Sequence, residues 1–193
     1  MWISERNTRI MPNATIPVAY RTFEEAFAFA NEKHSGQRLP GSELPYISHI
    51  ARVCFELLLL VDAASYEMEF LLVVAALHDT LEDTNTTEAE LLDRFGPRVL
   101  AAVKALTKDR RLPKALQIED SLNRIEAEPK EVQLVKLADR IANMDRPPPN
   151  WTQEKIREYR KSSELIWLKL KGVHDGLASR LNARISDYAR YLP

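Results

Sequence analysis

The sequence predicts an all-α protein, with one helical-bundle domain spanning residues 1–193. Glycine is scarce, with 5 residues in 193, and apolar residues recur at helical spacing along most of the chain. Residue pairs that typically open helices are present, whereas no run of alternating apolar and polar residues is long enough for a convincing strand. The hydrophobic share of 45% and the charged share of 28% are ordinary for a globular protein.

Capping residues indicate where the N-terminal helices begin. Thr22 and Glu25 have the spacing of a capping box, which predicts a first helix that begins at Thr22. A second helix is expected from about Ser48 to residue 61, after a loop over residues 35–45 that holds two glycines and two prolines. Ser65 can cap a third helix. Its segment Phe70–Leu77 is apolar on every side, so we expect it to be buried.

Glycine and proline divide the rest of the chain into further helices. Thr87 and Glu90 form another capping box, and the helix that they open should stop at Gly96. Prolines at positions 97, 113 and 129 each suit the first turn of a new helix. The helix after position 129 should end at the stiff loop 147–149, and two last helices are expected at about 152–171 and 175–191.

Bulk properties exclude several classes of partner. A net charge of −1 provides no overall basic field, so we expect no nucleic-acid partner. The longest apolar runs, residues 57–61 and 70–77, are too short to span a bilayer, and residues 1–18 contain no apolar segment typical of a signal peptide. Cys54 is the only cysteine, which favours a reducing compartment and a cytoplasmic location. The sequence does not indicate an oligomeric state.

Acidic residues follow a histidine at the end of the most apolar segment. His78 and Asp79 come directly after Phe70–Leu77, and Glu82 and Asp83 lie four residues further on. If the helix or a tight turn continues, these polar groups share one surface. A His-Asp pair by itself is more simply a polar helix terminus, because short motifs match by chance.

Two other segments add candidate ligands. His49 falls in the first turn of the second helix, and Asp139 and Asn143 are one turn apart on a strongly apolar helix, where an unpaired carboxylate would be costly. Asp139 could instead form a structural salt bridge. Together, His49, His78, Asp79 and Asp139 would give two nitrogen and two carboxylate ligands. That mixture suits manganese, iron or zinc better than calcium or magnesium.

The order of these motifs resembles the HD-domain superfamily, and within it the hydrolase domain of the ppGpp synthetase/hydrolases and the stand-alone small alarmone hydrolases. The similarity covers about residues 20–165, which leaves residues 1–19 as an N-terminal extension. It rests on the segments 34–38 (HSGQR), 45–49 (PYISH), 76–84 (ALHDTLEDT), 95–97 (FGP), 106–108 (LTK) and 136–143 (KLADRIAN), with Trp151 and Tyr159.

The resemblance implies an HD-type helical bundle with an interior metal site, and a role for each matching residue. It implies that His49, His78, Asp79 and Asp139 bind a divalent metal, most simply Mn²⁺. It further implies that Glu82 and Asp83 orient and activate the attacking water, and that the nucleotide substrate is contacted by Arg38, Asn143, Lys155 and Tyr159. The activity implied is release of the 3′-diphosphate of ppGpp or pppGpp as pyrophosphate.

Some substrate-contacting segments depart from the family pattern. The loop after Arg38 lacks a second basic residue, Ile50 replaces a common proline, and Met144 to Pro149 replaces a segment that carries a nucleotide-contacting threonine. These differences lie outside the metal ligands, so we expect hydrolysis with little selectivity for guanine. Two alternatives remain: a phosphatase for another 3′- or 2′-phosphorylated nucleotide, and a non-catalytic nucleotide sensor.

Overall fold

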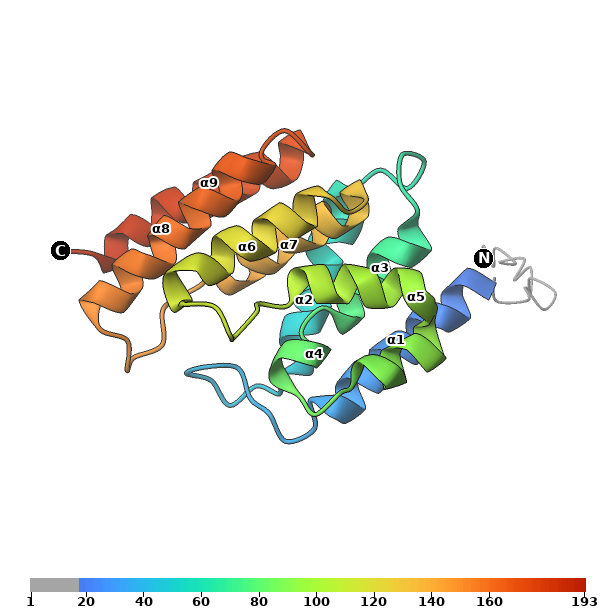
Figure 1. The fold of residues 1–193 in the computed structure, drawn as a ribbon. Helices are drawn as coiled ribbons and strands as arrows, with labels where there is room; N and C mark the ends of the chain where they lie inside the picture. Colours follow the sequence, from blue (N-terminus) through green and yellow to red (C-terminus); the bar gives the residue numbers. More distant parts are fainter. Residues whose placement is uncertain (1–17) are drawn as a thin grey trace, which may run out of the picture.

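The computed structural model describes residues 18–193, and these form a bundle of helices (Figure 1). The helices are α1 (Val18–Lys33), α2 (Ile47–Leu60), α3 (Met68–Leu77), α4 (Thr80–Asp83), α5 (Glu88–Leu106), α6 (Lys114–Glu126), α7 (Lys130–Asn143), α8 (Gln153–Leu170) and α9 (Asp175–Tyr188), followed by a 3₁₀ turn over Ala189–Tyr191. Among the described residues the only β-type pairing is a single antiparallel bridge between Arg38 and Pro45. The all-α prediction is confirmed. The N-terminal extension expected at residues 1–19 lies almost entirely outside the described residues.

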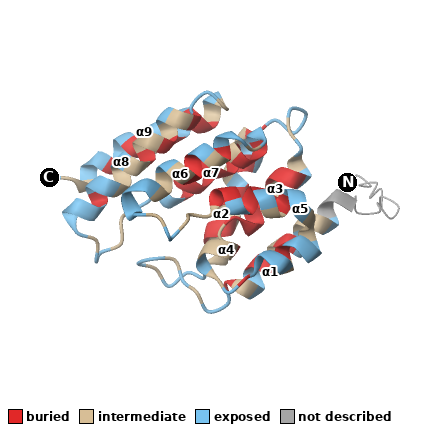
Figure 2. Cartoon of the chain, viewed as in Figure 1, coloured by how far each residue is buried: buried red, intermediate tan, exposed pale blue. Residues whose placement is uncertain are grey.

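Helices α3 and α7 form the centre of the bundle. Helix α3 packs against α1, α2, α5 and α7, while α7 also contacts α6, α8 and α9. Residues 70–71 and 73–77 of α3 are buried, as expected from their apolar character. Figure 2 shows the buried residues along the inner sides of the helices and the exposed residues on the outside. His78, directly after α3, and Asp139 on α7 are buried with them.

Several predicted helix ends are confirmed. Thr87 caps α5 with a complete capping box, in which its side chain accepts from the backbone N–H of Glu90 and the Glu90 carboxylate accepts from Thr87. Gly96 breaks the helical backbone with φ 81° and ψ 172°, so the helix kinks there and continues from Pro97. A residue with a Cβ would be strained at this positive φ.

Two sequence predictions are wrong. The first helix does not begin at Thr22, because α1 already starts at Val18. Ser65 does not cap α3. Its hydroxyl donates to Asp62 in the preceding turn, and Glu67 stands at the cap position instead. No helix between residues 18 and 193 has the length and apolar character needed to cross a membrane.

Candidate metal centre

Four predicted ligand residues meet at the buried end of α3. His49 lies in the first turn of α2, His78 and Asp79 join α3 to α4, and Asp139 faces inward from α7. Because α3 is apolar on all sides, its C-terminal end lies inside the bundle and carries His78 there. Both histidines and Asp139 are buried, and Asp79 is partly buried.

Their ligand atoms are close enough to share one ion. One such atom from each residue can be chosen so that all four lie within 4.8 Å of one another. Nε2 of His78 is 3.0 Å from Asp79 Oδ2, 3.3 Å from His49 Nε2 and 3.7 Å from Asp139 Oδ1. Nε2 of His49 is 3.4 Å from each of the same two carboxylate oxygens.

These separations fit the donor spacing around a transition-metal ion. Two ligands bound about 2.1 Å from one ion lie about 3.0 Å apart at a right angle and about 3.4 Å apart at the tetrahedral angle. Two facing imidazole nitrogens also need a shared proton or cation between their lone pairs. The buried His/Asp cluster therefore suits a divalent metal ion.

Neighbouring groups fix the orientation of three of the four candidate ligands. Nδ1 of His78 donates to the carbonyl oxygen of Ala75 at 2.7 Å, which leaves Nε2 as the ligand atom of a neutral ring. The Tyr46 hydroxyl donates to Asp79 Oδ2 at 2.6 Å. Lys136 Nζ donates to Asp139 Oδ2 at 3.1 Å. Such outer contacts hold the ligands in place before an ion binds.

The electrostatics of the cluster attract positive charge. Burial opposes a charged imidazole, yet the adjacent carboxylates of Asp79 and Asp139 outweigh burial and raise the pKa of His78. Burial likewise opposes ionisation of Asp139, but the Lys136 ammonium and the two histidines hold its pKa well below the usual range. In the absence of an ion, protons on the histidines supply the positive charge that a divalent cation would otherwise provide.

Glu82 and Asp83 lie on α4 beside the cluster, in different environments. Glu82 is partly buried and accepts from Lys108, through the backbone N–H at 3.1 Å and the ammonium at 2.6 Å. Asp83 is more exposed and is 3.3 Å from Nη2 of Arg110. Burial, followed by the negative charges of Asp79 and Glu82, raises the pKa of Asp83. A carboxyl with a raised pKa is a stronger proton acceptor once it is ionised.

Known proteins resemble this chain in sequence along most of its length. Residues 26–177 match the family model of the HD domain. The chain belongs to the HD domain family. It is 33% identical to guanosine-3′,5′-bis(diphosphate) 3′-pyrophosphohydrolase MESH1 of Xenopus tropicalis, over 84% of this chain and 92% of that protein. It is also 33% identical to human MESH1, over 81% of this chain and 89% of that protein.

A solved structure has the same fold. That protein is described as a metazoan ortholog of SpoT that hydrolyses ppGpp. It superposes with a TM-score of 0.76 and 28% identity, covering 86% of this chain and 94% of that one. The motifs predicted similarity over about residues 20–165. The family model matches residues 26–177, so the similarity continues further towards the C-terminus, into α9.

Two of the predicted substrate-binding residues, Asn143 and Arg38, have different surroundings: one bonds to the cluster and the other bonds within its own loop. Asn143 donates from Nδ2 to Asp139 Oδ1 at 2.6 Å, so it lies directly against the cluster. Arg38 is exposed and bonds within its own loop, to the backbone oxygen of Glu43 at 2.5 Å and to the Glu43 carboxylate at 3.0 Å. The structure therefore brings Asn143 to the cluster, whereas it holds Arg38 against Glu43.

Lys155 and Tyr159 line a cavity of about 670 Å³. Lys108, which binds Glu82, lines the same cavity. The cavity is basic: it is lined by Lys108, Lys114, Lys155, Lys161 and a single carboxylate, Glu158. Behind it, the buried guanidinium of Arg140 stacks on the Tyr159 ring, 4.4 Å from the ring centroid. The arrangement can accept an anionic ligand that extends away from the cluster.

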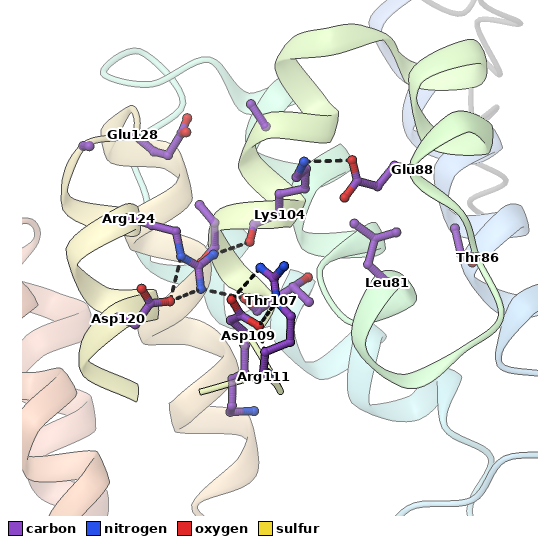
Figure 3. A pocket seen from close by; sticks show the side chains of 14 residues that line it. Leu81, Thr86, Glu88, Lys104, Thr107, Asp109, Arg111, Asp120, Arg124 and Glu128 are labelled. Carbon is purple, nitrogen blue, oxygen red and sulfur yellow. Dashed lines mark hydrogen bonds and ion pairs between the residues drawn. The ribbon is translucent and has the colours of Figure 1, made fainter. Parts of the chain in front are cut away.

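A second cavity, of about 850 Å³, is lined by charged residues that neutralise one another (Figure 3). Arg124 bonds to Asp120 at 2.7 Å and to the backbone oxygen of Thr107 at 2.9 Å. Arg111 pairs with Asp109, and Lys104 with Glu88, each at 2.7 Å. Because these cations already have carboxylate partners, this cavity is a poorer receptor for a polyanion than the lysine-lined one.

Sequence reasoning missed several residues that shape the centre. Lys108 binds Glu82, and Arg110 donates to the backbone oxygen of Glu82 at 2.8 Å. Gln37 donates to the backbone oxygen of Asp83 at 2.7 Å and is itself bonded to His34. Lys108 and Gln37 both belong to motifs of the family resemblance, so the sequence did mark their segments. Their partners are 26 and 46 residues away in the sequence, and for that reason the contacts themselves were not predicted.

Proposed function

We propose that this chain is a metal-dependent hydrolase that removes the 3′-diphosphate of ppGpp or pppGpp as pyrophosphate, leaving GDP or GTP. The observation that carries the proposal is the buried His/Asp cluster with an acidic pair beside it, in an HD domain that aligns along most of its length with MESH1 pyrophosphohydrolases. Both the cluster and the acidic pair would be needed for hydrolysis, whereas a nucleotide sensor needs neither.

His49, His78, Asp79 and Asp139 are the proposed metal ligands, and manganese is the proposed ion because the donor set mixes nitrogen and oxygen. Such an ion, when bound, lowers the pKa of a water molecule and polarises the phosphorus under attack. Turnover measured after reconstitution with manganese, iron, zinc or cobalt, with the metal content checked by elemental analysis, would test which ion supports the reaction. We also place the protein in the cytoplasm, where its single cysteine, Cys54, would stay reduced.

The proposed chemistry uses the acidic pair on α4. Asp83 takes a proton from the attacking water, whose oxygen forms a bond to the phosphorus attached to the ribose 3′-oxygen. The bond from that phosphorus to the 3′-oxygen breaks, the 3′-oxygen takes up a proton, and pyrophosphate leaves. Glu82, held by Lys108, keeps α4 in position beside the reacting group.

Nucleotide binding is proposed to extend from the cluster into the lysine-lined cavity. Asn143 bonds to Asp139 of the cluster, and in this proposal it contacts the sugar. Lys155 and Lys161 line the cavity and offset the charge of the 5′-phosphates, although the whole chain carries a net charge of −1. Tyr159 offers an aromatic face for stacking, which contributes affinity but little preference between purines.

The deciding experiment incubates the manganese-loaded protein with ppGpp, its adenine counterpart and a nucleoside 3′-monophosphate, and identifies the products by mass. We expect pyrophosphate from ppGpp, and kcat/KM for the adenine counterpart within about tenfold of that for ppGpp, since stacking reads both bases alike. His78→Ala protein serves as the inactive control. Orthophosphate from the monophosphate without pyrophosphate from ppGpp would instead indicate a phosphatase, and no product from any substrate would indicate a sensor.

A further inference from the structure

Helix α2 carries an apolar face that nothing in the described chain covers. Phe55 is 61% exposed, Leu58 51% and Leu59 78%. The remaining exposed large hydrophobic residues among those described are isolated on separate elements: Leu44, Leu92, Leu116 and Leu168. Only α2 therefore gathers several such side chains in one place.

The exposed residues lie on one side of α2 and the buried residues on the other. Phe55, Leu58 and Leu59 are spaced by three and four residues, so they share a face. The buried residues His49, Ile50, Val53, Cys54 and Leu57 form the opposite face and pack against α3 and α7. A helix that is apolar on both faces is usually buried on both. Three clustered apolar side chains left in water thus indicate a missing partner.

We propose that this α2 face, defined as Ala51, Arg52, Phe55, Leu58, Leu59 and Asp62, pairs with the same face of a second copy of the chain in an antiparallel arrangement. A two-fold pairing of identical faces is the commonest form of protein self-association. The two-fold axis crosses the exposed side of α2 at the level of residue 57. Phe55 of each copy then packs on Leu59 of the other copy, so the pairing forms two identical contacts.

The charges at the two ends of the face match in this arrangement. Within its own chain Arg52 donates from Nη2 to Asp145 at 2.9 Å, and no other N–H group of its guanidinium is bonded among the described residues. Antiparallel pairing brings this guanidinium of one copy to the C-terminal end of α2 in the other copy, beside Asp62. Asp62 is exposed and is bonded only to the backbone of Ala64 and the hydroxyl of Ser65, and it is in no ion pair among the described residues. The last turn of α2 contains no basic residue, so its carbonyl groups also favour an incoming cation. A parallel pairing would place like charges together.

The pairing leaves the metal centre free. His49 is at the start of α2, and its side chain is on the buried face. Substitutions on the α2 face should therefore change association without changing the metal content or the activity of each copy.

Sedimentation velocity over roughly 1 to 100 µM protein tests the pairing, a range suited to an interface of modest size. The wild-type chain should shift from monomer to dimer with concentration. Leu59→Glu should raise the dissociation constant by at least about 100-fold, since it places a charge against Phe55 of the other copy. The matched control Leu168→Glu, on the exposed side of α8, should dimerise like the wild-type chain.

A charge exchange tests the antiparallel register. Arg52→Asp and Asp62→Arg should each raise the dissociation constant by roughly tenfold, and the double variant should recover to within about threefold of wild type. Thermal unfolding of each variant checks that it is folded. A wild-type chain that stays monomeric at the highest concentration overturns the proposal. The α2 face would then have another occupant, such as residues 1–17, a different protein or a membrane. A dimer that the double variant fails to restore overturns the antiparallel pairing.

Discussion

Lys108 donates both its backbone N–H and its ammonium group to the carboxylate of Glu82, at 3.1 and 2.6 Å. This contact joins the segment after α5 to α4 and neutralises one member of the acidic pair. Asp83, the other member, is more exposed and accepts from Arg110 Nη2 at 3.3 Å. The two adjacent carboxylates therefore differ in their freedom to accept a proton: Glu82 is held in place, and Asp83 is available.

Asp83→Asn should lower turnover by roughly 10²-fold or more while the metal content stays unchanged, because the amide cannot accept the proton of the attacking water. Glu82→Gln should lower turnover to a similar degree. The structural reason differs, since that variant also loses the ion pair with Lys108. Steady-state kinetics and elemental analysis of the same preparations measure both effects. Wild-type turnover in both variants would remove the acidic pair from the mechanism.

Lys108→Met separates these two roles. It removes the ammonium but keeps the backbone N–H that donates to Glu82. If Glu82 acts mainly by positioning α4, Lys108→Met should reproduce most of the loss seen in Glu82→Gln. Lys104→Met is a matched control, because Lys104 pairs with Glu88 at 2.7 Å away from α4. A full loss in Glu82→Gln with none in Lys108→Met would show that Glu82 acts on the substrate directly.

The metal centre predicts about one divalent ion per chain, as four donors within 4.8 Å of one another can surround only one ion. His78→Ala should lose most of the bound metal and all measurable turnover. His174→Ala is the control: His174 caps α9 by accepting from the N–H of Leu177, and it should keep both properties. Full metal content and activity in His78→Ala would show that the ligand assignment is wrong.

An ion pair far from the centre predicts how stability depends on pH. Glu90 bonds to Lys33 and to Thr87, and these contacts lower the pKa of its carboxyl from 4.5 to about 2. A carboxyl with a depressed folded-state pKa contributes stability above the unfolded value of 4.5. That contribution is lost as the pH falls towards about 2, because the unfolded chain takes up the proton first.

Glu90→Gln should therefore show a flatter fall in the free energy of unfolding between pH 4.5 and pH 2 than the wild-type chain. Urea denaturation at a series of pH values measures the difference. Glu32→Gln is the control, since Glu32 is exposed on α1 and is in no ion pair among the described residues. Parallel curves for the wild-type chain and Glu90→Gln would contradict the depressed pKa.

The fold was predictable because helix pattern is local, and the four cluster residues could be named because their motifs occur in the order of the HD-domain superfamily. The apolar run Phe70–Leu77 predicted a buried helix, and a buried helix places His78 inside the bundle. Thr87 with Glu90 marked a real helix start, since each partner of a capping box is only three residues from the other. Thr22 with Glu25 has the same spacing but lies inside α1, where upstream residues already continue the helix.

Tertiary contacts were not predictable in the same way. The bond from Lys108 to Glu82 depends on the path of α5 after its kink at Gly96, and no residue near Lys108 specifies that path. The ion pair of Arg38 with Glu43 depends on the conformation of one loop. Sequence motifs named the right segments, but only the packing of the helices shows which polar groups neutralise one another.

The lysine-lined cavity predicts where the 5′-phosphates bind. Lys155 lines this cavity, and its ammonium lies 4.4 Å from the Trp151 ring centroid. Lys161, six residues further along α8, lines the same cavity. Neither lysine has a carboxylate within ion-pair distance among the described residues, so both charges are available to a ligand. Lys155→Ala and Lys161→Ala should each raise the KM for ppGpp by about tenfold, the cost of one charge-assisted contact, with little change in kcat.

The control substrate is guanosine 3′-diphosphate, which keeps the scissile group and lacks 5′-phosphates. Its KM should be unaffected by Lys155→Ala or Lys161→Ala, because the contact that each variant removes is absent. Lys171→Ala is the matched control variant: Lys171 also sits at an end of α8 against a tryptophan, 4.8 Å from the Trp167 ring centroid, but outside the cavity. If both substrates lose affinity equally in Lys155→Ala, that lysine contacts the 3′-diphosphate or the nucleoside, and the 5′-phosphates extend elsewhere.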